Sequence, residues 1–215
     1  MTPDYWPKAT AHLKKRDKKL GAIISSYRGE KMQLRGKGFE TLARAIVGQQ
    51  ISVKAADSVW KKLQTALAPH PTLPRKGGGI CPEVVANTDA TILRACGLSA
   101  SKVIYLHALA NHFLENKNVI KRWPKMDDEE IIEELTSIKG IGRWTAEMFL
   151  IFGLGRPDVF PIGDLGLLKG IYRHYNDGNT MKKEKVMAIG EAWQPYRSVG
   201  TWYMWRALDP VPVVY

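Results

Sequence analysis

The chain has 215 residues, of which 45% are hydrophobic, a share that supports a globular core and excludes a disordered chain. Lys and Arg number 32 against 21 Asp and Glu, so the formal net charge of +11 favours a polyanionic partner, nucleic acid before a membrane surface. No apolar run approaches the roughly 20 residues that a membrane span requires, and the start lacks the apolar core of a signal peptide, so we expect a cytoplasmic protein, nucleoid-associated if its source is bacterial.

Apolar residues recur at helical spacing along the chain, and no stretch alternates as a strand would. The pattern predicts an all-α fold of about ten helices. The expected helices cover residues 7–16, 17–27, 39–47, 52–67, 99–116, 164–175, 180–193 and 197–208, with another beginning at Asp127 and short helical turns between 83 and 96. Residues 69–79 are predicted to form an exposed Pro/Gly-rich loop without function, residues 121–125 a turn, and the Pro/Val tail an irregular end.

Small polar residues mark several helix starts. Asp17, Ser52 and Thr180 precede apolar-periodic segments and are predicted N-caps. Asp127 with Glu130 three residues later has the pattern of a capping box. Each cap provides an acceptor for backbone N–H groups that have no partner inside the helix.

Two glycines, Gly140 and Gly142, flank Ile141 in a turn between two helical segments. Glycine permits a positive φ and lets another backbone approach, and the helix that follows presents free N–H groups, which suit an anion. A plain corner with glycine as the C-cap explains the same pattern equally well. The charge of +11 favours the interpretation as a phosphate site.

Several other kinds of site are absent from the sequence. It contains no Walker A motif, no HExxH motif and no GxSxG motif. His107 and His112 are five residues apart and so face different sides of one helix, which argues against a shared metal. Cys81 and Cys96 are too few to hold an iron–sulfur cluster, and we expect both to be free thiols.

The segment LxxIKGIGRxTA at residues 135–146 resembles the hairpin of the helix-hairpin-helix DNA glycosylase superfamily, and residues 153–164 resemble the Gly/Pro-rich loop that ends in its aspartate. The nearest resemblance is to the 3-methyladenine DNA glycosylases of alkylation repair. Three further segments agree in order and spacing: AIVGQQIS at 45–52, GLS at 97–99 with Lys102, and WQPYRS at 193–198 leading to Trp205. The resemblance covers most of residues 39–208 and fits the compact members, which lack the N-terminal β-rich domain of larger ones.

The resemblance implies a single glycosylase domain over residues 1–215, with two helical lobes around a DNA-binding cleft. A central lobe with the hairpin would take about residues 39–150, and residues 1–38 plus 151–215 would form the second lobe.

The resemblance also assigns roles residue by residue. Asp164 matches the catalytic aspartate, and Trp144, Met148 and Trp205 match the substrate pocket. Main-chain donors to DNA phosphate match Gly140, Gly142 and Thr145, while Gln50, beside Gln49, matches the side chain that wedges into the duplex. The main-chain carbonyls of Thr136, Ile138 and Ile141 match those that hold a monovalent cation, Na⁺ or K⁺.

Two of these positions depart from patterns seen in relatives. Members that also cut the DNA strand carry a nucleophilic Lys where Trp144 stands, and Trp cannot form a Schiff base. Met148 replaces an aromatic residue found in some relatives, which bears on the range of substrates.

The expected protein is a monofunctional DNA glycosylase that flips alkylated purines of the 3-methyladenine type from double-stranded DNA and hydrolyses the N-glycosidic bond. It would act as a monomer in base excision repair, without a required cofactor and away from membranes. Two alternatives remain: a glycosylase for uracil, hypoxanthine or an etheno-adduct, and a non-catalytic DNA-binding module that uses the hairpin alone.

Overall fold

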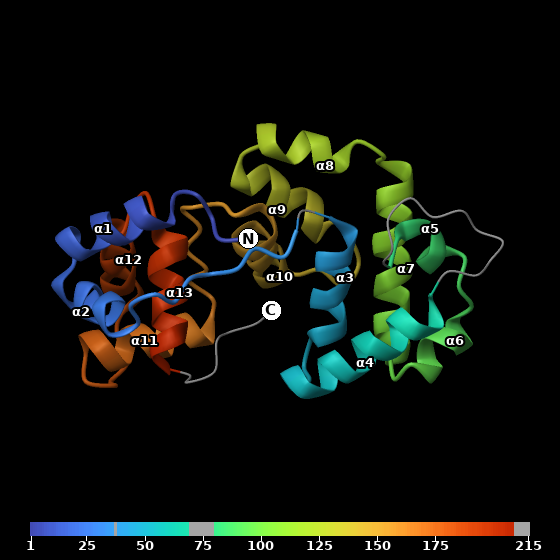
Figure 1. Cartoon of the computed structure of the whole chain (residues 1–215), viewed down its shortest axis with the longest axis horizontal. Coiled ribbons are helices and arrows are strands. Elements are labelled where there is room, and N and C mark those ends of the chain that lie inside the picture. The colour runs from blue at the N-terminus through green and yellow to red at the C-terminus, as the bar shows by residue number, and fades with distance from the viewer. Residues whose placement is uncertain (37, 69–79, 209–215) are drawn as a thin grey trace. The chain divides into compact units, whose positions relative to one another are not determined.

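The computed structural model describes residues 1–36, 38–68 and 80–208, and every regular element within them is a helix, which confirms the predicted all-α fold. Figure 1 shows α1 (Trp6–Arg16), α2 (Lys18–Ser26), α3 (Phe39–Gly48), α4 (Val53–Ala66), α5 (Pro82–Ala86), α6 (Ala90–Ala95), α7 (Ala100–Glu115), α8 (Val119–Arg122), α9 (Asp128–Thr136), α10 (Arg143–Met148), α11 (Leu165–Tyr175), α12 (Lys183–Ala192) and α13 (Arg197–Leu208). A 3₁₀ turn (Trp123–Lys125) follows α8, and a π-helical turn (Phe149–Leu154) follows α10. The predicted loop at 69–79 and the tail at 209–215 lie outside the described residues.

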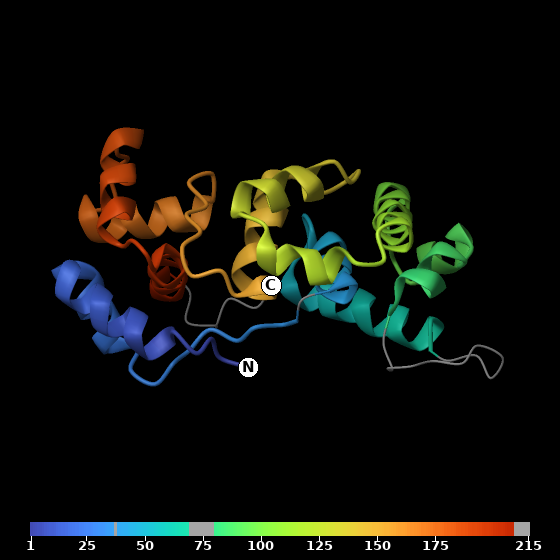
Figure 2. The ribbon, with the colours of Figure 1, turned by 90° about the horizontal axis from the view of Figure 1, so that it is seen from above.

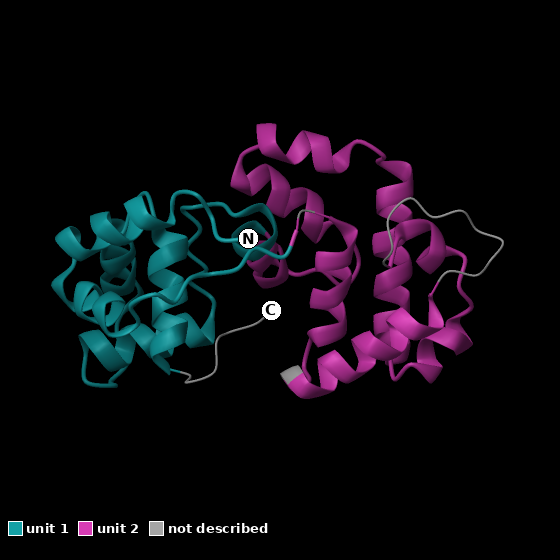
Figure 3. Cartoon of the chain, viewed as in Figure 1, with its two compact units in different colours: residues 1–35, 150–214 teal, residues 36–149, 215 magenta. Residues whose placement is uncertain are grey.

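The chain divides into two compact units, which Figure 3 shows in different colours. Unit 1 consists of residues 1–35 and 150–214, and unit 2 of residues 36–149 with 215. The hairpin glycines therefore belong to unit 2, and Asp164 belongs to unit 1. Among the described residues, no helix has the length and apolar character that crossing a membrane would demand.

Helix α13 is the centre of unit 1, where it packs against α1, α2, α11 and α12 (Figure 2). Its residues from Ser198 to Arg206 are all buried, as expected for a helix covered on every side. A Cβ on Gly170 would lie 2.9 Å from Met204, so a glycine is needed for α11 to cross α13 this closely. The crossing holds α11, and with it the Asp164 that precedes it, against α13.

Helix α7 is the centre of unit 2 and packs against α3, α5 and α6. Its predicted apolar face is buried as expected and comprises Val103, Leu106, Leu109, Ala110 and Phe113. Edge-to-face aromatic contacts extend from this face, joining Phe113 to Phe39 at 5.5 Å and to Trp123 at 5.8 Å between ring centroids. Trp123 in turn meets Phe149 at 5.1 Å. The end of α10 is thereby packed into the same core as α7.

The helix boundaries confirm most of the predicted caps and correct one. Asp17 accepts a hydrogen bond from the Leu20 N–H at 3.0 Å, and Ser52 caps α4. The capping box of Asp127 and Glu130 is present in both directions, at 2.8 Å each. The predicted cap at Thr180 is wrong, because α12 begins only at Lys183.

Residues 121–125, predicted as a turn, are instead the end of α8 and the 3₁₀ turn. Trp123 within that turn is fully buried, so tertiary packing of its ring explains the helical structure where the local sequence has a proline.

Candidate nucleic-acid interface and carboxylate site

Two glycines in the hairpin between α9 and α10 have different surroundings: one is packed against a side chain and the other is next to open space. Gly140 has φ +94°, and a Cβ there would lie 2.1 Å from the Tyr105 ring, so only glycine fits on both counts. Gly142 is the N-cap of α10, and a Cβ there would point into open space. Because Gly142 has no side chain, the N-cap offers no side-chain acceptor to the N–H groups in the first turn of α10.

Arg143 fastens the two helices of the hairpin. Its guanidinium binds both carboxylate oxygens of Glu129 on α9, at 2.9 and 2.5 Å, and its Nε donates to Glu147 at 3.1 Å. The hydrogen bonds with Glu129 raise the pKa of the Arg143 guanidinium and lower the pKa of the Glu129 carboxyl. Both side chains are more than half exposed, so the ion pair contributes little to stability and serves mainly to fix the geometry of the hairpin.

The junction of α3 and α4 is tied to the hairpin by Gln49. Its side-chain amide donates to the Gly140 carbonyl at 3.0 Å and lies 3.5 Å from the Thr145 hydroxyl. The next residue, Gln50, is exposed and has φ +58°. Of the two glutamines predicted at the interface, Gln49 therefore holds the hairpin and Gln50 projects from the surface.

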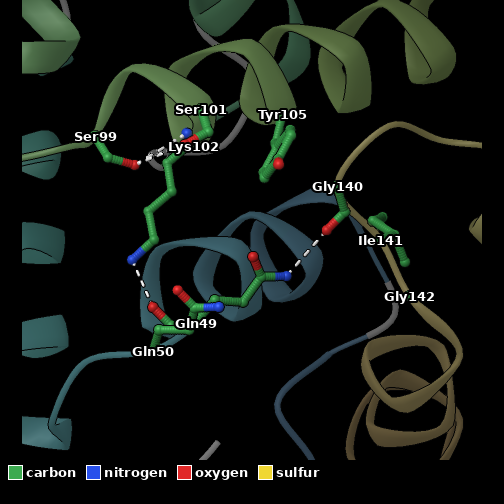
Figure 4. Close-up of a pocket in the computed structure, with 9 residues that line it drawn as sticks. All are labelled: Gln49, Gln50, Ser99, Ser101, Lys102, Tyr105, Gly140, Ile141 and Gly142. Atoms are coloured by element: carbon green, nitrogen blue, oxygen red, sulfur yellow. Dashed lines mark hydrogen bonds between the residues drawn. The ribbon is translucent and has the colours of Figure 1, made fainter.

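Lys102 near the start of α7 reaches the same junction (Figure 4). Its ammonium donates to the carbonyls of Val47 and Gln49, at 2.8 Å each. Burial lowers the pKa of this ammonium. A polar cavity of about 400 Å³ lies beside these groups, lined by Gln49, Gln50, Ser99, Ser101, Lys102, Tyr105, Gly140, Ile141 and Gly142.

The hairpin carbonyls predicted to hold a cation lie in the segment from Thr136 to Ile141. The Ile138 carbonyl accepts one hydrogen bond, from the Ile141 N–H at 3.1 Å, and a carbonyl oxygen has a second lone pair. No group of three or more His, Cys, Asp or Glu side chains in the described parts of the chain could hold a metal. Carbonyl oxygens can coordinate a monovalent cation, and a Na⁺ or K⁺ ion at these carbonyls stays a prediction.

Asp164 is the N-cap of α11 and is almost fully buried. Its Oδ1 accepts hydrogen bonds from the Leu167 N–H and from Trp205 Nε1–H, at 2.6 Å each. A Cβ on Gly166 would lie 2.9 Å from the Trp205 ring and 3.1 Å from Oδ1, so glycine leaves the room that this contact requires. The structural role of a helix cap and the presentation of a fixed carboxylate thus coexist in one residue.

Trp205, predicted for the substrate pocket, is joined to the predicted catalytic residue directly. Its ring also stacks on Phe152, with centroids 5.8 Å apart and an interplanar angle of 20°. Trp144 and Met148 lie one turn apart on α10, in unit 2. The Trp144 side chain is accessible at 37% exposure, whereas Met148 is buried.

The sequence did not reveal every residue of these sites. Lys102 stands out only as part of a segment that resembles the family, and no sequence pattern points to Tyr105 or Phe152. The Ser99 N-cap fixes the start of α7, and the helical period then places positions 102 and 105 on the same face one turn apart.

The chain is similar in sequence to known proteins over most of its length. Residues 43–195 match the family model described as HhH-GPD superfamily base excision DNA repair protein. The chain is 34% identical over 203 residues to DNA-3-methyladenine glycosylase 1 of Schizosaccharomyces pombe, a match that covers 93% of this chain and 86% of that protein.

Two solved structures are similar over nearly the whole chain. The first is a DNA-3-methyladenine glycosidase from Bacillus halodurans, with a TM-score of 0.79 and 31% identity, covering 96% of this chain and 91% of that one. The second is a 3-methyladenine DNA glycosylase from Schizosaccharomyces pombe in complex with abasic DNA, with a TM-score of 0.76 and 31% identity, covering 97% of this chain and 100% of that one.

Proposed function

Because the chain belongs to the HhH-GPD superfamily of base excision DNA repair proteins, we propose that it is a DNA glycosylase that excises alkylated purines of the 3-methyladenine type from double-stranded DNA. The observation that carries the proposal is the buried carboxylate of Asp164, which Leu167 and Trp205 hold through one oxygen. A helix cap alone needs no indole donor, and binding a polyanion needs no carboxylate.

Asp164 supplies the chemistry in this proposal. Breaking the N-glycosidic bond builds positive charge on the sugar, and a carboxylate stabilises that oxocarbenium-like charge and deprotonates or positions water. An alkylated purine already carries positive charge and leaves without being protonated. One carboxylate therefore suffices where glycoside hydrolases use two.

The hairpin supplies the grip on DNA. The uncapped start of α10 offers N–H groups and a favourable helix dipole to a backbone phosphate, and Gly142, where a Cβ would meet no atom within 4 Å, permits close approach. A cation on the carbonyls of Thr136, Ile138 and Ile141 would add positive charge beside that phosphate. Gln50 fills the gap that the flipped base leaves in the duplex.

The pocket residues set the reaction type. The rings of Trp144 in unit 2 and of Trp205 in unit 1 are both of a kind that binds a cationic base. Trp144 has no amine to attack the sugar, so the product is an abasic site in an uncut strand. Met148 on the same helix bears on which adducts the pocket accepts.

Base release by Asp164→Asn tests the proposal. Asn caps helices about as well as Asp, and its amide oxygen can accept the bonds from Leu167 and Trp205, so the fold should persist. We expect the rate of release of an alkylated purine to fall at least about a hundredfold. Full activity in this variant would refute the role of Asp164.

Asp177→Asn is the matched control. Asp177 is exposed in a turn with φ +50°, a conformation that Asn tolerates, and its substitution removes the same unit of charge. We expect this variant to release base at the wild-type rate. A panel of uracil, hypoxanthine and etheno-adduct duplexes in the same assay separates the alternative lesions.

A further inference from the structure

Gln50 holds a backbone conformation that its own side chain does not explain. A φ of +58° is the left-handed region, which costs a residue other than glycine on the order of 1 kcal/mol or more. Gln50 is exposed, so burial of its side chain does not offset the cost. Neighbouring groups must therefore fix the peptide that leads into it.

Lys102 is the group that contacts this peptide. Its ammonium donates at 2.8 Å to the carbonyl of Gln49, which belongs to the peptide bond joining Gln49 to Gln50. It donates at 2.8 Å to the carbonyl of Val47 as well. A cation at the last carbonyls of α3 satisfies acceptors that the helix leaves unpaired and interacts favourably with the helix dipole.

Helix α7, which carries Lys102, also positions the hairpin. Tyr105, one turn beyond Lys102 on α7, occupies the space that a side chain at Gly140 would need. The Gln49 amide connects the two contacts, because it donates to the Gly140 carbonyl at 3.0 Å (Figure 4). The first turns of α7 thus hold the α3–α4 junction and the hairpin in one arrangement inside unit 2.

We propose that Lys102 is a positioning residue that holds the Gln49–Gln50 peptide in the conformation from which Gln50 enters the duplex. The inference rests on the proposed function of the chain as a glycosylase. Lys102 touches neither the base nor the sugar in this account. Lys102 acts on the backbone of Gln50, so its substitution should slow base release only where a wedge must enter the duplex.

That dependence gives a readout that a general loss of structure would not produce. A lesion opposite its normal partner must be unpaired and its gap filled, whereas a lesion opposite an abasic-site analogue is already unpaired. Single-turnover base release from these two duplexes therefore separates wedging from chemistry. An alkylated adenine opposite thymine and the same strand opposite the abasic analogue serve as probes.

Lys102→Met keeps the apolar stem and removes the donors. We expect the rate to fall about tenfold on the paired duplex and less than about threefold on the unpaired one. The tenfold loss corresponds to the free energy of the strained Gln50 conformation that the variant no longer holds. Lys102→Arg, which keeps charge and donors, should recover most of the paired rate. An equal loss on both duplexes, or no loss on either, would overturn the inference.

A double-mutant cycle with Gln50→Gly tests the route through Gln50. Glycine adopts a positive φ without strain and has no wedge, so adding Lys102→Met to Gln50→Gly should change the paired rate less than about twofold. Multiplicative effects of the two substitutions would show that Lys102 acts elsewhere.

Controls keep the outcome interpretable. Lys117→Met removes the same charge from an exposed turn of unit 2 and should match wild type on both duplexes. If Lys102→Met fails to fold, Lys102→Gln, with a shorter amide donor, carries the same prediction with a smaller split. Wild type that releases no base from either duplex would refute the proposed function, whereas active wild type with an unaffected Lys102→Met variant would refute only this inference.

Discussion

The contact between Trp205 and Asp164 can be tested by removing a single donor. In Trp205→Phe the ring that stacks on Phe152 keeps its aromatic face, but the Nε1–H that donates to Oδ1 at 2.6 Å is lost. Both residues are at most 5% exposed, so the hydrogen bond is to a charged group shielded from water.

The size of the effect follows from that burial. A hydrogen bond to a charged group contributes about 1.5–3 kcal/mol, and the same loss in the transition state lowers the rate by about ten- to a hundredfold. The hairpin is untouched, so affinity for DNA should stay close to that of wild type. Single-turnover base release and equilibrium DNA binding, measured side by side, check both expectations.

Trp202→Phe is the matched control, since it makes the same substitution one turn earlier on α13, where the ring contacts Trp6 and Tyr203. It should lower the melting temperature without lowering the rate. In an Asp164→Asn background, Trp205→Phe should add little. If Trp205→Phe releases base as fast as Trp202→Phe, the Trp205 indole does not position the Asp164 carboxylate.

The remaining predictions concern the hairpin. Gly140→Ala should destabilise the fold by several kcal/mol and weaken DNA binding, because the new Cβ would meet the Tyr105 ring and φ is +94°. Thermal melting checks this against Gly142→Ala, whose Cβ would meet no atom within 4 Å. Equal melting temperatures of the two variants would contradict the prediction. Borohydride should trap no covalent adduct on lesion DNA, since Trp144 cannot form a Schiff base, and a trapped adduct would refute a monofunctional reaction. Replacing Na⁺ and K⁺ with tetramethylammonium at equal ionic strength should weaken DNA binding if the hairpin carbonyls hold a small cation, and unchanged affinity would remove the cation from the account.

Local patterns predicted much of the fold. The apolar face of α7 follows from helical spacing, the start of α13 at Arg197 follows from the preceding Pro195, and the capping box of Asp127 follows from two residues. These features depend on residues within a few positions of each other, where side-chain chemistry and helical period act directly.

The contacts that define the candidate sites depend on residues far apart in the sequence. Lys102 binds carbonyls 53 and 55 residues away, and every residue has such a carbonyl, so no side-chain pattern points to the pair. The bond between Trp205 and Asp164 spans 41 residues and exists only because α11 crosses α13 at Gly170. The left-handed Gln50 could not be predicted, since that conformation normally indicates glycine.

Chromatography of the free bases released from methylated duplex DNA shows whether this chain hydrolyses the N-glycosidic bond of alkylated purines. We expect wild type to release 3-methyladenine and to leave an uncut strand with an abasic site. Duplex DNA that is bound with no free base released would contradict it and would favour a DNA-binding module that uses the hairpin alone.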